Sequence, residues 1–333
     1  MDRDQMPISP PWPVIGHEWA VALLRQAVTT GRLGHAYLFT GPKGVGKGTL
    51  AQALAQAVLC TGDVPPCGRC RACRLVGAGR HPDLHRLAPQ DGSLKIEQVR
   101  ELERQLALTP VEGSRHVAIL EGMEWATVGA ANALLKTLEE PPPSVLLILL
   151  AEEADALLPT IVSRCQVLPL RPLPRATVEQ ALRERWGVEP ERAALLARLS
   201  GGRLGWAVRA VQDPSLLESR ATRLEALQRL LVADRVERFA YAEKLARDKE
   251  CARETLALWA GWWRDLLILV SGAEAPLTNV DHRETLRRWA ERYDLVTVRR
   301  CLDALQQALH RLDQNANPRL TLEVLMLDLP STR

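Results

Sequence analysis

A glycine-rich loop constrains the possible folds of this chain more than any other stretch. The loop spans Gly41–Thr49, follows the apolar run 35–39 and precedes a helical pattern that begins at Leu50. A strand, a glycine loop, a lysine and a helix in this order are typical of a P-loop, whose backbone N–H groups and helix N-terminus bind phosphate. The residues predicted to form this cradle are Gly41, Gly44, Gly46, Lys47, Gly48 and Thr49.

The residue after the lysine departs from the usual P-loop pattern. A Ser or Thr hydroxyl normally binds Mg²⁺ at this position, and this chain has Gly48 instead. Thr49 follows one residue later, about 100° further round a helix, so its hydroxyl is not expected to reach the same metal position. The loop is therefore predicted to hold phosphate, with ATP and ADP as candidate ligands, and to be poorly equipped for hydrolysis. Hydrolysis with Thr49 as the metal ligand stays open as an alternative.

A second departure follows the apolar run His116–Leu120, which predicts a buried strand. In ATPases such a strand ends in an Asp that supports Mg²⁺, and the Glu that follows activates water. Here Glu121 can replace the Asp, but the next position is Gly122. The interpretation that we favour is that Glu121 and Glu124 begin the next helix, where acidic residues suit the helix dipole.

Four of the seven cysteines are clustered, and their spacing predicts a metal site. Four thiolates can surround one tetrahedral Zn²⁺, and Gly68 permits the tight turn of a zinc knuckle. Separate buried thiols are the alternative, but they do not explain paired C-x-x-C spacing. With four protein ligands the site is structural rather than catalytic, although it could also face a partner. The predicted ligands are Cys60, Cys67, Cys70 and Cys73.

The composition indicates a globular protein of more than one domain. The chain has 333 residues, of which 47% are apolar and 25% charged, and its longest apolar run, 145–151, is too short to span a bilayer. The segment Met1–Asp4 is polar, so we expect no secretory signal and a cytoplasmic location. A net charge of +3 is too small to predict nucleic-acid binding, and the C-terminal third has no basic run.

Strands and helices alternate in the first half of the chain, which predicts a parallel, doubly wound sheet. His81 and His85 flank one of the strands, and we interpret them as surface or boundary histidines rather than further metal ligands. Beyond Arg171–Pro174 only helical patterns follow. In one of them three tryptophans at i, i+3 and i+4 predict helix–helix packing. The predicted strands are 36–39, 84–87, 116–121, 145–150 and 166–170, and the tryptophans are Trp259, Trp262 and Trp263.

The motifs together resemble the AAA+ clamp-loader family of DNA replication, and within it the delta-prime subunits of bacterial DNA polymerase III. The resemblance covers essentially the whole chain. It is carried by the four cysteines and by VIGHE at Val14–Glu18, HAYLFTGPKGVGK at His35–Lys47, NALLKTLEEPPP at Asn132–Pro143, SRC at Ser163–Cys165 and NANPRLTLEVLML at Asn315–Leu327.

The resemblance implies an α/β domain followed by all-α domains. Residues 1–170 are expected to form a RecA-like AAA+ P-loop domain with a zinc module at 60–73. Residues 171–213 then form a small helical lid, and residues 214–333 form a helical collar that mediates oligomerisation. The family implies a hetero-pentamer with delta and gamma/tau subunits, contact with the sliding clamp and primer–template DNA, and no membrane.

The departures place the chain among the non-hydrolysing members of the family rather than the gamma/tau motors. The motor's sensor Thr falls in the region of Glu152, and its lid arginine falls on about Gly205, with Arg203 nearby. The resemblance implies that Arg164 is an arginine finger, which enters the neighbouring subunit's ATP site and stabilises the transferring phosphoryl group. A surface salt bridge is the alternative role of Arg164.

The expected function is therefore that of a stator in clamp loading, with no ATPase activity of its own. Two rival functions stay open. The first is an active ATPase motor of the same family, and the second is a zinc-dependent nucleic-acid-binding protein whose P-loop is incidental.

Overall fold

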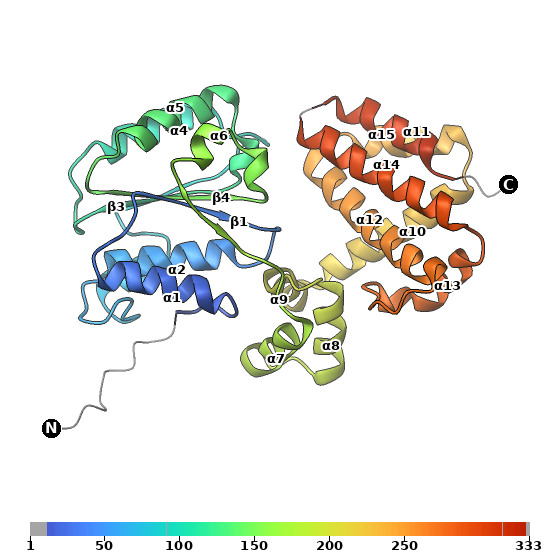
Figure 1. The fold of residues 1–333 in the computed structure, drawn as a ribbon, viewed down its shortest axis with the longest axis horizontal. Coiled ribbons are helices and arrows are strands. Elements are labelled where there is room, and N and C mark those ends of the chain that lie inside the picture. The colour runs from blue at the N-terminus through green and yellow to red at the C-terminus, as the bar shows by residue number, and fades with distance from the viewer. Residues whose placement is uncertain (1–11, 91, 315, 331–333) are drawn as a thin grey trace. The chain divides into compact units, whose positions relative to one another are not determined.

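The computed structural model describes residues 12–90, 92–314 and 316–330, so the polar segment Met1–Asp4 lies outside the described residues. The chain divides into two compact units, Met1–Leu173 and Pro174–Arg333, and each is described by itself. Figure 1 shows that the first unit contains the sheet and that the second is built from helices.

The first unit is organised around a five-stranded sheet in the order β2-β3-β4-β1-β5, and every neighbouring pair of strands is parallel. This confirms the predicted parallel sheet. The P-loop strand lies between β4 and β5, with Thr40 opposite both Ala151 and Pro169. The strands are β1 (Ala36–Thr40), β2 (Leu84–Leu87), β3 (His116–Leu120), β4 (Val145–Ala151) and β5 (Gln166–Pro169).

Helices cover both faces of the sheet, because successive side chains of a strand point to opposite faces. Phe39 and Ile148 belong to the apolar core on one face, and Leu38 and Leu147 to the core on the other. Figure 1 shows α1 and α2 on one side of the sheet and α4, α5 and α6 on the other. The helices are α1 (Glu18–Thr29), α2 (Lys47–Leu59), α3 (Arg71–Gly77), α4 (Ile96–Leu106), α5 (Val128–Glu139) and α6 (Pro159–Val162).

The second unit is helical in the part of it that the structure describes. The predicted tryptophan packing is confirmed, since Trp259, Trp262 and Trp263 are fully buried in the largest apolar core of this unit. The helices are α7 (Arg175–Trp186), α8 (Pro190–Leu199), α9 (Leu204–Gln212), α10 (Ser215–Val232), α11 (Arg235–Leu245), α12 (Lys249–Ser271), α13 (Arg283–Ala290), α14 (Leu295–Asp313) and α15 (Pro318–Asp328).

The boundary between a lid and a collar stays a prediction. Both predicted domains fall within the second unit, Pro174–Arg333. The buried members of the core around the tryptophans all come from residues 224–329, and none comes from α7, α8 or α9. Within the described residues, no helix is long and apolar enough to cross a membrane.

A buried carboxylate fixes the loop between α4 and β3. Asp83 is fully buried and accepts hydrogen bonds from the backbone N–H groups of Val111, Glu112 and Gly113, at 2.6, 2.9 and 2.7 Å. Burial opposes ionisation of Asp83, but these donors and the neighbouring His116 hold its pKa below the usual value. A carboxylate in this position therefore stabilises the folded first unit.

The two histidines that flank β2 were expected at the surface or at a boundary. His85 is half-buried, which agrees with a boundary position, whereas His81 is buried, which corrects the expectation for that residue. His81 Nδ1 accepts the backbone N–H of Asp83 at 3.1 Å, and His85 Nε2 lies 3.2 Å from His116 Nδ1. His85 also contacts the side chain of Gln105 in α4, at 3.0 Å, and a short sequence window does not reveal such tertiary contacts. Among the described residues, the cluster able to hold a metal contains four cysteines and neither histidine.

We expect the substitution Asp83→Asn to lower the free energy of unfolding at neutral pH by about 2–3 kcal/mol. The amide replaces one of the two accepting carboxylate oxygens by an NH2 group, which cannot accept a backbone N–H and leaves buried donors facing one another. The folded pKa of Asp83 is depressed, so its contribution is present above the unfolded pKa and is lost as pH falls through the folded pKa. Urea denaturation, followed by circular dichroism at a series of pH values from pH 7 into the acid range, measures the free energy of unfolding. The exposed Asp155→Asn is the control, and equal stability of the two variants at pH 7 would contradict the role of Asp83.

Candidate functional site

The P-loop connects the carboxyl end of β1 to the first turn of α2, as predicted. Gly46 immediately precedes α2 with φ 121°, a conformation that side chains rarely adopt. Gly41 has φ 138°, and a Cβ atom there would lie 2.2 Å from the carbonyl oxygen of Leu170. The first glycine of the loop is therefore required by close packing against the chain that follows β5.

Lys47 is held by carbonyl groups of its own loop. Its Nζ donates to the carbonyl oxygens of Gly41 and Pro42. Burial lowers the pKa of Lys47, and the carboxylates of Glu152 and Glu124 partly offset this. The positive charge of the loop is thus partly balanced by groups of the chain itself.

The position after the lysine has room for a larger residue. A Cβ atom added to Gly48 would meet no heavy atom within 4 Å, so packing does not exclude Ser or Thr there. Thr49 is exposed on the first turn of α2. The absence of a hydroxyl at residue 48 is therefore a chemical difference from a magnesium-binding P-loop and not a steric necessity.

The acidic residues after β3 do not begin the next helix, and our interpretation of them was wrong. Gly122 adopts a left-handed conformation, and Glu124 lies in the short 3₁₀ turn η1 (Met123–Trp125). Helix α5 begins only at Val128, where the side chain of Thr127 caps it by accepting the N–H of Ala130 at 3.2 Å.

Glu121 at the end of β3 forms an ion pair with Arg86 of β2, at 3.7 Å. Arg86 also donates to the side-chain oxygen of Gln52 in α2, at 3.1 Å. The carboxylate that stands where a motor has its magnesium-supporting Asp is thus engaged with a cation of the neighbouring strand.

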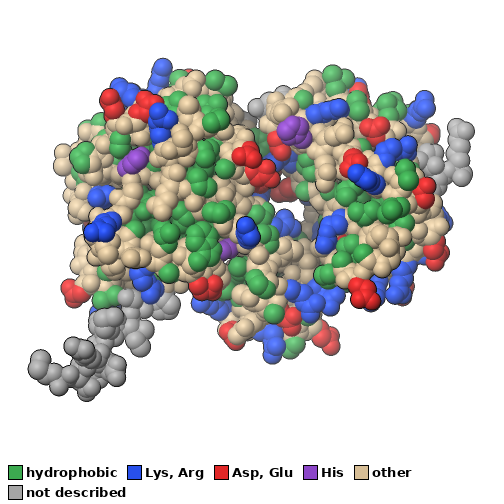
Figure 2. Space-filling model, in the orientation of Figure 1, with side chains coloured by type: hydrophobic (Ala, Val, Ile, Leu, Met, Phe, Trp, Pro, Cys, Tyr) green, Lys and Arg blue, Asp and Glu red, His purple; other side chains and the backbone are tan. Residues whose placement is uncertain are grey.

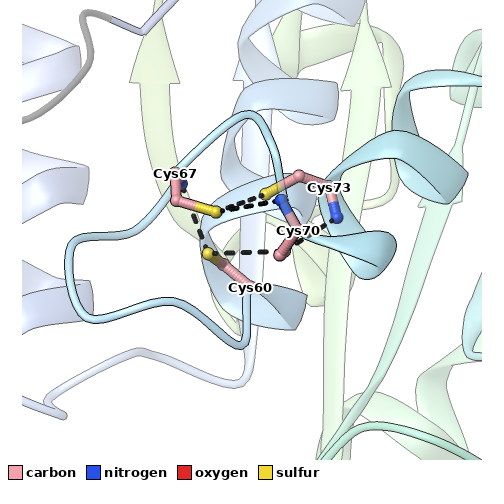
Figure 3. Close-up of side chains that lie close together, drawn as sticks. All are labelled: Cys60, Cys67, Cys70 and Cys73. Carbon is pink, nitrogen blue, oxygen red and sulfur yellow. Dashed lines mark hydrogen bonds between the residues drawn. The ribbon is translucent and has the colours of Figure 1, made fainter.

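The four predicted metal ligands converge, as Figure 3 shows. Their sulfur atoms all lie within 4.8 Å of one another. The Sγ atoms of Cys60 and Cys70 are 3.9 Å apart, and those of Cys67 and Cys73 are 4.0 Å apart. A tetrahedral zinc ion with Zn–S bonds of about 2.3 Å separates its sulfurs by about 3.8 Å. The cluster therefore fits a metal ion of this kind.

Backbone donors around the cluster stabilise thiolates. The N–H groups of Cys67, Cys70 and Cys73 each donate to a cysteine Sγ at 3.3 Å. Burial opposes ionisation of Cys70, but donors from Cys73 and Thr61 outweigh it and lower its pKa to about 6. For Cys60 and Cys73 burial outweighs the donors and raises the pKa. Gly68, which lies between Cys67 and Cys70 in the sequence, has φ 70°, as the predicted tight turn requires. A bound zinc ion would crosslink this loop to the start of α3.

Arg164 lies in the turn between α6 and β5 and is about one-third exposed. Its guanidinium lies 2.8 Å from a carboxylate oxygen of Glu139, the last residue of α5, and donates to the carbonyl oxygen of Thr160 at 2.9 Å. The contact with Glu139 matches the alternative role, a salt bridge, and also holds the side chain in one direction. An exposed pair of this kind contributes about 0–1 kcal/mol to stability.

Arg164 and the P-loop of the same chain lie at opposite edges of the sheet. Arg164 precedes Gln166, which is paired with Tyr37, whereas the P-loop begins at Gly41 beyond the other end of β1. The two sites are therefore separated by roughly 15–20 Å of strand length. Arg164 cannot act on a nucleotide held by its own P-loop.

Two residues of these sites were not singled out by sequence reasoning. They are Glu139, which pairs with Arg164, and His17, whose Nε2 lies 3.1 Å from the carbonyl oxygen of Val45 in the P-loop. His17 has the left-handed φ of 57°, which is uncommon for a residue with a side chain. Both lie in blocks that carry the family resemblance, and this is the signal by which they could have been found.

Comparisons with known proteins agree with that resemblance. Residues 16–174 match the family described as DNA polymerase III, delta subunit, and residues 214–330 match its C-terminal family. The chain is 33% identical to DNA polymerase III subunit delta' of Bacillus subtilis, over 92% of this chain and 94% of the relative. The chain belongs to the DNA polymerase III subunit delta' family.

Two further relatives are consistent with this membership. The subunit delta' of Pseudomonas aeruginosa is 38% identical over 65% of this chain and 67% of that protein. Subunit gamma/tau of Mycobacterium bovis is 30% identical over 96% of this chain, but over only 61% of its own length.

Replacement of one cysteine should release the metal. We expect Cys70→Ser to reduce bound zinc from about one ion per chain to near none, because three remaining ligands hold a structural zinc weakly. Inductively coupled plasma mass spectrometry of the purified full chain measures this. The control is Cys251→Ser, since Cys251 lies outside the cluster. Full zinc content in Cys70→Ser would contradict the four-cysteine site.

Proposed function

We propose that this clamp-loader subunit of DNA polymerase III is a largely non-hydrolysing stator that presents Arg164 to the ATP of a neighbouring gamma/tau motor. In this role it helps the loader to open the sliding clamp and to place it on primed DNA. Its partners are delta and gamma/tau in a hetero-pentamer, with the clamp and primer–template DNA in contact with the complex.

One observation carries this proposal. Arg164 lies at the amino edge of the sheet, opposite the chain's own P-loop, and is held there by Glu139 and the carbonyl group of Thr160. A guanidinium that is oriented and partly exposed can stabilise the charge of a transferring phosphoryl group. Because its own nucleotide site is out of reach, the nucleotide that it serves has to belong to another subunit.

The state of the P-loop supports the same role. The chain lacks a hydroxyl at Gly48, its Glu121 is paired with Arg86, and Gly122 cannot activate water. The rival function as a motor would need Thr49 to replace the missing hydroxyl, but Thr49 is exposed one residue further round α2. ATP or ADP in this loop would then be bound without turnover, or the loop would have a purely structural role.

The division into three domains fits this proposal as well. The predicted P-loop domain with its zinc module, 1–170, would carry both Arg164 and the structural zinc. The predicted lid, 171–213, and collar, 214–333, would then serve assembly of the ring. The separate apolar core of residues 224–329 supports an independent collar.

In the reconstituted loader we expect Arg164→Ala to leave assembly intact and to lower the DNA-stimulated ATPase rate strongly, by at least about 10³ at each site that depends on the finger. Steady-state phosphate release with clamp and primed DNA measures this rate, and size-exclusion chromatography checks assembly. Arg183→Ala, an exposed arginine of α7, is the matched control. An unchanged rate in the assembled Arg164→Ala loader would refute the finger.

The isolated chain is expected to turn over no ATP, and Gly48→Thr is expected not to create turnover. The added hydroxyl fits the space at residue 48, but the positions that support Mg²⁺ and activate water after β3 are still missing. A radiolabelled-ATP hydrolysis assay on both proteins tests this. Turnover by the unaltered chain that disappears in Lys47→Ala would instead favour the motor function.

A further inference from the structure

A corner of the second unit displays arginines that no site described above uses. We name residues 283–300, which comprise α13 and the start of α14, the arginine corner. It contains six arginines and three acidic residues. All six arginines are exposed. They are Arg283, Arg287, Arg288, Arg292, Arg299 and Arg300.

Buried apolar side chains fix the backbone of the arginine corner. Leu286, Trp289, Tyr293 and Val298 all belong to the apolar core of the second unit. The rings of Trp289 and Tyr293 are stacked with centroids 5.8 Å apart, and the guanidinium of Arg292 lies 5.2 Å from the Trp289 ring centroid. The arginines are therefore presented on a fixed surface and not on a mobile tail.

The charges of the corner are only partly balanced within the described chain. Hydrogen bonds with Thr297 and the nearby charge of Arg300 lower the pKa of the Asp294 carboxyl. None of the six arginines forms an ion pair among the described residues, whereas Arg220 is paired with Asp281 and Arg253 with Asp313. The carboxylate of Asp294 is occupied at the N-terminus of α14, where it accepts the N–H of Thr297 at 2.8 Å. Figure 2 shows Lys and Arg side chains, with a few acidic ones beside them, over the region where Figure 1 labels α13.

We propose that the arginine corner binds the sugar–phosphate backbone of a nucleic acid, without reading its sequence. Guanidinium groups bind phosphate oxygens in a bidentate manner and stay charged at every physiological pH. Arg283 and Arg287 stand one helical turn apart, about 5–6 Å, so that they can contact successive parts of a polyanion. The sequence hides this surface, since no run of basic residues is present and the arginines gather only when α13 and α14 fold.

An acidic protein is the competing occupant. Leu295 and Val296 are exposed at the start of α14, with exposed fractions of 47% and 75%, and would suit an apolar contact. Six exposed guanidinium groups, none of them in an ion pair with a described residue, around only two such side chains favour a highly charged, sequence-independent partner. The proposal stands on this corner alone and not on the role of Arg164, so that either can fail without the other.

The test compares two variants of the full chain that lose the same charge. The first variant, called the corner variant, combines Arg287→Gln, Arg288→Gln and Arg299→Gln. The control variant combines Arg183→Gln, Arg185→Gln and Arg192→Gln, and these arginines are also exposed. Fluorescence anisotropy with a labelled duplex and a labelled single strand is measured over a series of salt concentrations. Circular dichroism confirms folding, and the three single variants replace the first combination if it unfolds.

We expect the control to bind DNA like the unaltered chain. The corner variant should bind more weakly, and its slope of log affinity against log salt should be shallower by about 0.9 per lost phosphate contact on the duplex, or about 0.7 on the single strand. The comparison of the two probes shows which form is preferred. Two results would overturn the proposal: equal weakening of DNA binding in the control variant, or no DNA binding by the unaltered chain at low salt. Polyglutamate that competes with the labelled DNA as strongly as unlabelled DNA of equal charge would also overturn it, in favour of an acidic protein.

Discussion

The parallel pairing of β1 with β4 and β5 is the constraint on which the functional geometry of the first unit depends. In a parallel sheet, segments that follow strands meet at one edge and segments that precede strands meet at the other. The P-loop follows β1 and Glu152 follows β4, whereas Glu139 precedes β4 and Arg164 precedes β5. The glycine loop and Arg164 are thereby separated by topology, and small changes of side-chain conformation cannot bring them together.

The charged groups of this chain differ in how far neighbouring groups of the same chain compensate their charge. Lys47 donates to carbonyl groups of its own loop, and the carboxylates of Glu152 and Glu124 raise its pKa. Glu121 is paired with Arg86. The groups that a motor would direct at magnesium and nucleotide are thus partly satisfied internally. Arg164 also has a carboxylate partner, Glu139, and its side chain remains about one-third exposed. The six arginines of the arginine corner differ from Arg164 in that none forms an ion pair with a described residue.

The fold was predictable where the local pattern and the tertiary packing agree. Strands such as Val145–Ala151 are continuous apolar runs because both faces of the sheet are covered, and the four cysteines have a spacing with one simple interpretation. Helix α3 was not predicted, because its start overlaps the cysteine cluster, which was interpreted as a zinc knuckle and not as a helix. The interpretation of Glu121 and Glu124 was wrong because the left-handed Gly122 interrupts the chain before α5, a backbone state that acidic residues nearby do not signal.

By itself the sequence determined the glycine loop between strand and helix, the cysteine cluster, the parallel sheet and the family, since each depends on residue type and spacing along the chain. Only the tertiary structure decided which groups meet. It paired Arg164 with Glu139, placed both at the edge opposite Gly41, and gathered arginines from α13 and α14 into one surface. Such contacts join residues through strand order and helix packing, which are set by the whole core and not by any local stretch of sequence.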